Sequence, residues 1–162
     1  MIAISLAINY PHLVKKMVLG SSSSKPNETI YKVFNHWIDI AKTKDVPALN
    51  RDFFEKVYSE EFKKNYKEVL KTSEQNGTAS DCMNFIIYAK ACTTFNAYDK
   101  LDKIKCPVLV IGSDKDCVLT GPGSREIAEK IGCEIYMYSG YAHAVYDEAP
   151  DYKQRLLDFF NK

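Results

Sequence analysis

The chain has 162 residues, of which 46% are hydrophobic and 12% aromatic. This composition supplies a sizeable core for one domain and excludes an intrinsically disordered, collagen-like or coiled-coil protein. The 22 Lys and Arg residues nearly balance the 21 Asp and Glu residues, so no global electrostatic field favours nucleic acid or an anionic membrane as a partner.

Targeting signals and metal-binding clusters are not evident in the sequence. No apolar run approaches the roughly 18 residues of a membrane-spanning helix, and the apolar stretch 1–8 lacks the basic leader and cleavage site of a signal sequence. The cysteines are odd in number and contain no CxxC pair: Cys82, Cys92, Cys106, Cys117 and Cys133. We therefore expect a cytoplasmic protein with buried free thiols and no zinc site.

The chain opens on half of a parallel α/β unit. Residues 2–10 are typical of the last turns of a helix that stops before Pro11, and no Ser, Thr, Asp or Asn is present to cap its start. Residues 14–19 predict a short strand, closed by Gly20 and the run Ser21–Ser24. A helix followed directly by a strand indicates a parallel sheet, and we interpret the start of the chain as cut.

The middle of the chain predicts a helical layer. Apolar residues recur with a period of about 3.6 residues over three ranges, 29–43, 47–58 and 59–72. Ser80 or Asp81 can cap a fourth helix that ends near Thr94. The aromatic residues of this layer are expected to form mostly its own core, and they could also line an acyl pocket: Phe34, Trp37, Phe53, Phe54, Tyr58, Phe62, Phe85, Tyr88 and Phe95.

The last third predicts strands and helices in alternation. Residues 107–112 form a continuous apolar run, as expected for a strand buried on both faces of a parallel sheet. Residues 122–131 predict a helix with Pro near its start and Gly just past its end. Residues 134–139 predict a further strand, and residues 150–160 a closing helix. The predicted fold class is therefore α/β, with about three parallel strands.

Asp116 and His143 each follow one of these predicted strands. In open α/β sheets, sites form at the carboxyl ends of the strands, where the loops of adjacent strands lie side by side. A carboxylate that accepts the Nδ1–H of an imidazole fixes its tautomer and leaves Nε2 free to act as a base. Small residues around His143 (Gly140, Ala142 and Ala144) leave room for its loop to present the ring. The spacing predicts a catalytic Asp–His pair.

The order of these segments resembles the α/β-hydrolase superfamily over essentially the whole chain. Residues 1–19 resemble the helix after the nucleophile elbow and the strand that follows it. Residues 106–119 resemble the strand and loop that bring the triad acid, residues 139–143 the histidine loop, and residues 150–161 the final helix. The helical middle looks like the family's cap.

This resemblance implies the C-terminal part of a hydrolase. The implied domains are a sheet core over residues 1–24 and 96–162 and a helical cap over residues 25–95. The implied activity is that of a serine hydrolase, esterase-like or lactonase-like, acting on a small-molecule acyl substrate. His143 would be the general base and then the general acid, and Asp116 its orienting partner. No metal or organic cofactor is implied.

The nucleophile of the family has no counterpart in the sequence. Family members carry a serine in a Gly-x-Ser-x-Gly motif on a strained turn, and no such motif occurs among the 162 residues. Ser21–Ser24 follow Gly20, but no glycine closes the pattern. We therefore expect the triad to be incomplete and the chain to be truncated and inactive alone. The acid also has an alternative, because Asp114 follows Gly112 as closely as Asp116 does.

A non-catalytic function is the alternative hypothesis. Without further strands, the strand at residues 14–19 would expose an unpaired edge, which invites pairing with another chain. The chain would then be a hydrolase-derived interaction module, a dimer or other homo-oligomer, or the partner of a missing N-terminal half. Neither hypothesis predicts nucleic acid or a membrane as a partner.

Other polar residues are interpreted as structural. We expect His12 in an exposed turn and His36 at a surface or interface of the helical layer. Asp147 and Glu148 are more typical of the start of the last helix than of a metal site. Residues 121–124 open a helix that resembles a phosphate site, but they lack the Lys of a P-loop.

Overall fold

The three strands form one parallel sheet in the order β1-β2-β3. In the computed structural model, which describes residues 1–162, the strands are β1 (Met17–Gly20), β2 (Val108–Ser113) and β3 (Glu134–Tyr138). Val18 pairs with Leu109, and Leu109 pairs with Glu134, so β2 is the central strand. The sheet confirms the predicted fold class and leaves β1 and β3 as its edges.

The first strand is shorter than residues 14–19. Its ladder starts at Met17, whose N–H donates to the carbonyl of Pro107 at 3.0 Å. In a parallel ladder, the next hydrogen bond toward Val14 would come from the N–H of residue 107, which proline lacks, so the pairing ends there.

Helices cover both faces of the sheet. The flanking helices are α1 (Ile2–Asn9), α7 (Gly121–Ile131), α8 (Val145–Glu148) and α9 (Tyr152–Asn161), and two 3₁₀ turns span Pro11–Leu13 and Tyr98–Lys103. Val108 and Val110 pack with α1 and α7, whereas Leu109 and Ile111 pack with α8 and α9. Because successive side chains of a strand point to opposite faces, this double cover explains the unbroken apolar run of β2.

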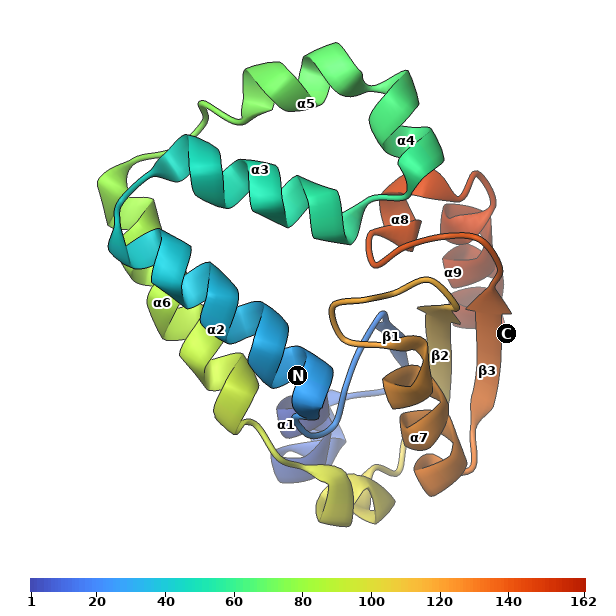
Figure 1. Cartoon of the computed structure of the whole chain (residues 1–162). Coiled ribbons are helices and arrows are strands. Elements are labelled where there is room, and N and C mark those ends of the chain that lie inside the picture. Colours follow the sequence, from blue (N-terminus) through green and yellow to red (C-terminus); the bar gives the residue numbers. More distant parts are fainter.

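A layer of five helices lies over the carboxyl ends of the strands (Figure 1). They are α2 (Glu28–Lys42), α3 (Val46–Val57), α4 (Glu60–Asn65), α5 (Lys67–Ser73) and α6 (Ala79–Thr94). The apolar residues of α2, α3 and α6 form a core around Trp37, which is 1% exposed, and this core also includes Val118 and Ala144 from the loops after β2 and β3. Figure 1 shows the α4 end of this layer next to α8, the short helix that follows the β3 loop. No helix in the molecule is long and apolar enough to cross a membrane.

Three further local predictions were wrong. Residues 59–72 form two helices, because the chain leaves helical geometry at Tyr66 (φ −113°), whose ring stacks on Phe62 at 4.4 Å. Helix α6 is capped by Thr78, with Asp81 closing the capping box from N3. Asp147 and Glu148 lie in α8 and precede the last helix, since Pro150 separates the two helices.

The cysteines are free, but only Cys82 is buried. Cys117 is exposed, and the other three are partly buried. The expectation of buried thiols therefore holds only for Cys82 and fails most clearly for Cys117, which lies in the loop after β2 and not within the strand itself.

Candidate active site

The structure brings Asp116 and His143 together. Asp116 lies in the loop after β2 and His143 in the loop after β3, and these strands are neighbours. His143 Nδ1 lies 3.0 Å from Asp116 Oδ2. The side chain of Asp116 is 1% exposed and that of His143 is 18% exposed. The carboxylate is therefore shielded from solvent, whereas part of the imidazole remains accessible to solvent.

Asp116 is held as an anion with a fixed orientation. Its Oδ1 accepts the backbone N–H groups of Val118 (2.8 Å) and Leu119 (3.0 Å). Burial by itself would raise the pKa of this carboxyl, but the His143 hydrogen bond, the His143 charge and the two N–H donors outweigh it and lower the pKa below its usual value. The second oxygen is therefore presented to His143 as an ionised acceptor.

We predict that Asp116 contributes to acid denaturation. A carboxyl whose pKa is lower in the folded chain stabilises the fold above its unfolded pKa of about 3.9, and that stability is lost as the pH falls through the lower folded pKa. Urea unfolding should therefore show the free energy of unfolding of the unaltered chain declining as the pH falls below about 5. Asp116→Asn should decline less steeply, and an unchanged slope in this variant would contradict the prediction.

Asp114 lies away from His143 and fastens the start of its loop. Asp114 Oδ1 accepts the N–H of Gly140 at 2.8 Å, and Oδ2 accepts the hydroxyl of Ser139 at 2.9 Å. The Gly140 N–H bond, followed by the Ser139 bond, lowers the pKa of Asp114. Gly140 has φ +85°, a left-handed conformation that glycine adopts without strain.

Two further serines hold the middle of the histidine loop. Ser113, at the end of β2, donates its hydroxyl to the carbonyl of Ala142 at 2.6 Å. Ser21, directly after β1, donates to the carbonyl of His143 itself at 2.7 Å. Ser21 has φ +39°, a strained conformation for a residue other than glycine. The sequence analysis assigned this role to neither serine, although Ser113 is the last residue of β2 and Ser21 directly follows β1.

The remaining candidates take no part in this pair. His12 is exposed, and His36 Nε2 lies 3.1 Å from Asp52 Oδ1 in the helical layer. Gly121, Gly123 and Ser124 are buried by packing, which leaves no open anion site at the start of α7. No group of three or more His, Cys, Asp or Glu residues is arranged to hold a metal ion.

The aromatic residues of the helical layer mostly contact one another. Trp37 packs against Phe34, Phe53 and Phe85 at centroid distances of 5.3, 5.1 and 6.1 Å. A cavity of about 410 Å³ opens between α4 and the start of the histidine loop, and its lining is mostly polar. His143 does not line this cavity, so the cavity adjoins the histidine loop without containing its ring.

Solved structures share this arrangement of strands, loops and helical layer. The α/β hydrolase MGS-M2, from a Medee basin deep-sea metagenome library, superposes with a TM-score of 0.88 at 25% identity, over 99% of this chain and 61% of its own. The chain has the fold of the α/β-hydrolase superfamily. The enol-lactonase of Burkholderia xenovorans superposes with a TM-score of 0.85 at 17% identity, over 98% of this chain and 61% of its own.

Curated relatives agree with the α/β-hydrolase assignment. The chain is 24% identical over 163 aligned positions to the "Putative carbamate hydrolase RutD" of Rhizobium rhizogenes, and 25% identical to the protein of the same name from Agrobacterium fabrum. The chain spans 62% of the length of these relatives. No family model matches the sequence.

Proposed function

We propose that the chain supplies the base and acid of a serine-hydrolase active site. The observation that carries this proposal is the 3.0 Å contact between His143 Nδ1 and a buried, ionised Asp116 at the carboxyl ends of adjacent strands. In such a pair the carboxylate holds the Nδ1–H tautomer, so Nε2 can take the proton of a serine hydroxyl and later give it to the leaving group. An ester, lactone or related acyl bond such as a carbamate is the proposed substrate.

The serine nucleophile and oxyanion hole are proposed to come from a segment outside the 162 residues. Support comes from the absence of Gly-x-Ser-x-Gly in the sequence and from the relatives, of whose length the chain spans only 62%. On this proposal the 162 residues alone are inactive. Residues 25–95 act as the substrate-covering cap, and residues 1–24 and 96–162 act as the sheet core.

The test begins with the source DNA directly upstream of the Met1 codon. An in-frame Gly-x-Ser-x-Gly-Gly would define an extended chain, which should react covalently with a fluorophosphonate probe while the 162-residue chain does not. His143→Ala should abolish labelling of the extended chain, and His36→Ala, which alters a histidine of the helical layer, should not. Labelling that survives in His143→Ala would refute the assigned role.

A second candidate function is a non-catalytic interaction module. It is favoured by the free edge of β1, which pairs on one side only. Two apolar residues that precede β1 in the chain are also exposed to solvent, Ile2 to 87% and Leu13 to 62%. A stop codon upstream of Met1, together with a defined dimer mass at micromolar concentration, would support this function. A monomeric mass for the 162-residue chain would exclude self-association through β1.

A further inference from the structure

The C-terminal end of α3 touches both loops of the Asp–His pair. The last four carbonyls of a helix have no partner within it, and in α3 the final two are satisfied from the sheet core. The carbonyl of Lys56 accepts the thiol of Cys117 at 3.2 Å, and that of Val57 accepts the N–H of Ala144 at 2.8 Å. Cys117 directly follows Asp116, and Ala144 directly follows His143. The end of α3 is therefore bonded to both loops, in each case at the residue that directly follows Asp116 or His143.

Glu148 adds a side-chain connection at the same place. Ser59 caps α4, with its hydroxyl accepting the N–H of Phe62 at 3.2 Å. In a capping box, the residue at N3 returns a carboxylate to the backbone N–H of the cap, but N3 of α4 is Phe62. Glu148 of α8 takes that role from outside the helix: its Oε1 accepts the N–H of Ser59 at 3.0 Å, and its Oε2 accepts the Ser59 hydroxyl.

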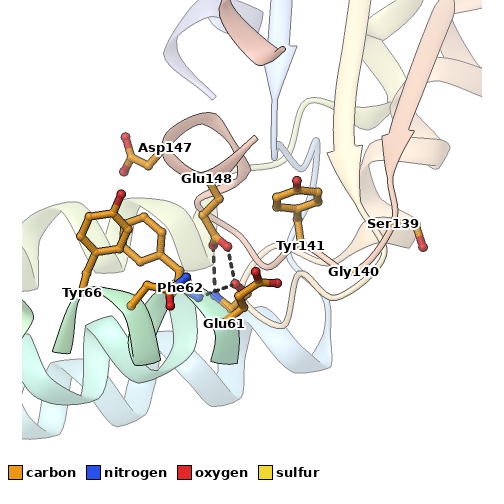
Figure 2. Close-up of a pocket in the computed structure, with 10 residues that line it drawn as sticks. Glu61, Phe62, Tyr66, Ser139, Gly140, Tyr141, Asp147 and Glu148 are labelled. Carbon is orange, nitrogen blue, oxygen red and sulfur yellow. Dashed lines mark hydrogen bonds between the residues drawn. The ribbon is translucent and has the colours of Figure 1, made fainter. Parts of the chain in front are cut away.

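Figure 2 shows this connection at the wall of the 410 Å³ cavity, with both hydrogen bonds of Glu148 directed at the start of α4. Tyr58 adds a third bond, from its hydroxyl to Asp147 Oδ2 at 3.2 Å. Burial, followed by the charge of Asp147, raises the pKa of Tyr58 to about 12, so this phenol stays a donor. We call the contacts of residues 56–59 with Cys117, Ala144, Asp147 and Glu148 the α3–α8 latch.

We propose that the α3–α8 latch positions His143 against Asp116, with Glu148 and Ser59 as its positioning residues. This inference rests on the proposed function of the pair. Ala144 and Val145, which follow His143, are fully buried. The Ser21 and Ser113 bonds hold the carbonyls of His143 and Ala142, and the latch holds the residues that follow His143. Without the Glu148 bonds to Ser59, α8 keeps only the Tyr58–Asp147 hydrogen bond to residues 58 and 59, and the Val57–Ala144 bond next to His143 loses this support. The ring then samples orientations in which Nδ1 no longer faces Asp116.

The experiment uses NMR on the 162-residue chain. In the unaltered chain, the Nδ1–H of His143 should give a downfield proton signal, and the Ala144 amide should exchange slowly with solvent. In Glu148→Ala we expect the Nδ1–H signal to weaken or vanish and Ala144 exchange to accelerate about tenfold or more. Glu61→Ala is the matched control, because Glu61 lines the same cavity and makes no bond to α8, and it should leave both readouts unchanged.

The outcomes separate the latch from the function. A strong Nδ1–H signal in both the unaltered chain and a folded Glu148→Ala variant, with slow Ala144 exchange retained, would overturn the latch and leave the proposed function standing. No Nδ1–H signal in the unaltered chain would overturn the Asp–His pair on which both rest. If Glu148→Ala does not fold, Ser59→Ala, which keeps the carboxylate and the backbone bond, should still weaken the signal, and a wild-type spectrum for it would refute the proposal.

Discussion

Asp116→Asn should lower the turnover of the extended, nucleophile-bearing chain by about four orders of magnitude. The reason lies in the second oxygen of the carboxylate. Oδ1 is held by the N–H groups of Val118 and Leu119, so an asparagine at this position must keep its carbonyl there and direct its NH₂ at His143. An NH₂ donor at Nδ1 forces the proton onto Nε2, and the imidazole can then no longer accept the proton of a serine.

Asp114→Asn is the matched control for this prediction. Asp114 stands outside the Asp–His pair: it accepts hydrogen bonds from Gly140 and Ser139 at the start of the histidine loop and makes no hydrogen bond to His143. We expect its replacement to lower turnover less than about tenfold, since the net contribution of such hydrogen bonds is about 1 kcal/mol. Steady-state kcat for an activated ester measures both variants. A larger loss in Asp114→Asn than in Asp116→Asn would reverse the assignment of the acid.

Trp37→Ala should destabilise the chain by about 3–5 kcal/mol. Trp37 is 1% exposed and lies at the centre of the helical-layer core, where removal of the indole leaves a cavity between Phe34, Phe53 and Phe85. The indole N–H also donates to Asp52 Oδ2 at 2.7 Å, and that bond is lost as well. The free energy of unfolding in urea measures the effect.

Two variants serve as controls for the loss of Trp37. Trp37→Phe keeps most of the ring volume and loses the bond to Asp52, so it should cost less than the alanine variant. Tyr88→Ala removes an aromatic ring that is 69% exposed on α6, and it should change stability by no more than about 0.5 kcal/mol. A Trp37→Ala chain as stable as Tyr88→Ala would show that the helical layer does not depend on this core.

The sequence by itself determined the parallel sheet and the loops that carry the candidate site. The apolar run of β2 required cover on both faces, and α1 and α7 on one side and α8 and α9 on the other provide it. Asp116 and His143 each follow a strand, so strand adjacency alone predicted that their loops meet. These inferences succeed because the hydrophobic pattern of each element, and the order of the elements along the chain, can be seen in the sequence without knowledge of the tertiary structure.

Only the tertiary structure decided which side chains in those loops contact His143. Asp114 and Asp116 are two residues apart and chemically identical, and the path of the loop alone brings Asp116 to the imidazole and Asp114 to Gly140. The bonds from Ser21 to His143 and from Ser59 to Glu148 join residues 122 and 89 positions apart. Neither leaves a periodic trace in the sequence, because a hydrogen bond between distant residues depends on how the layers pack and not on the order of their residues.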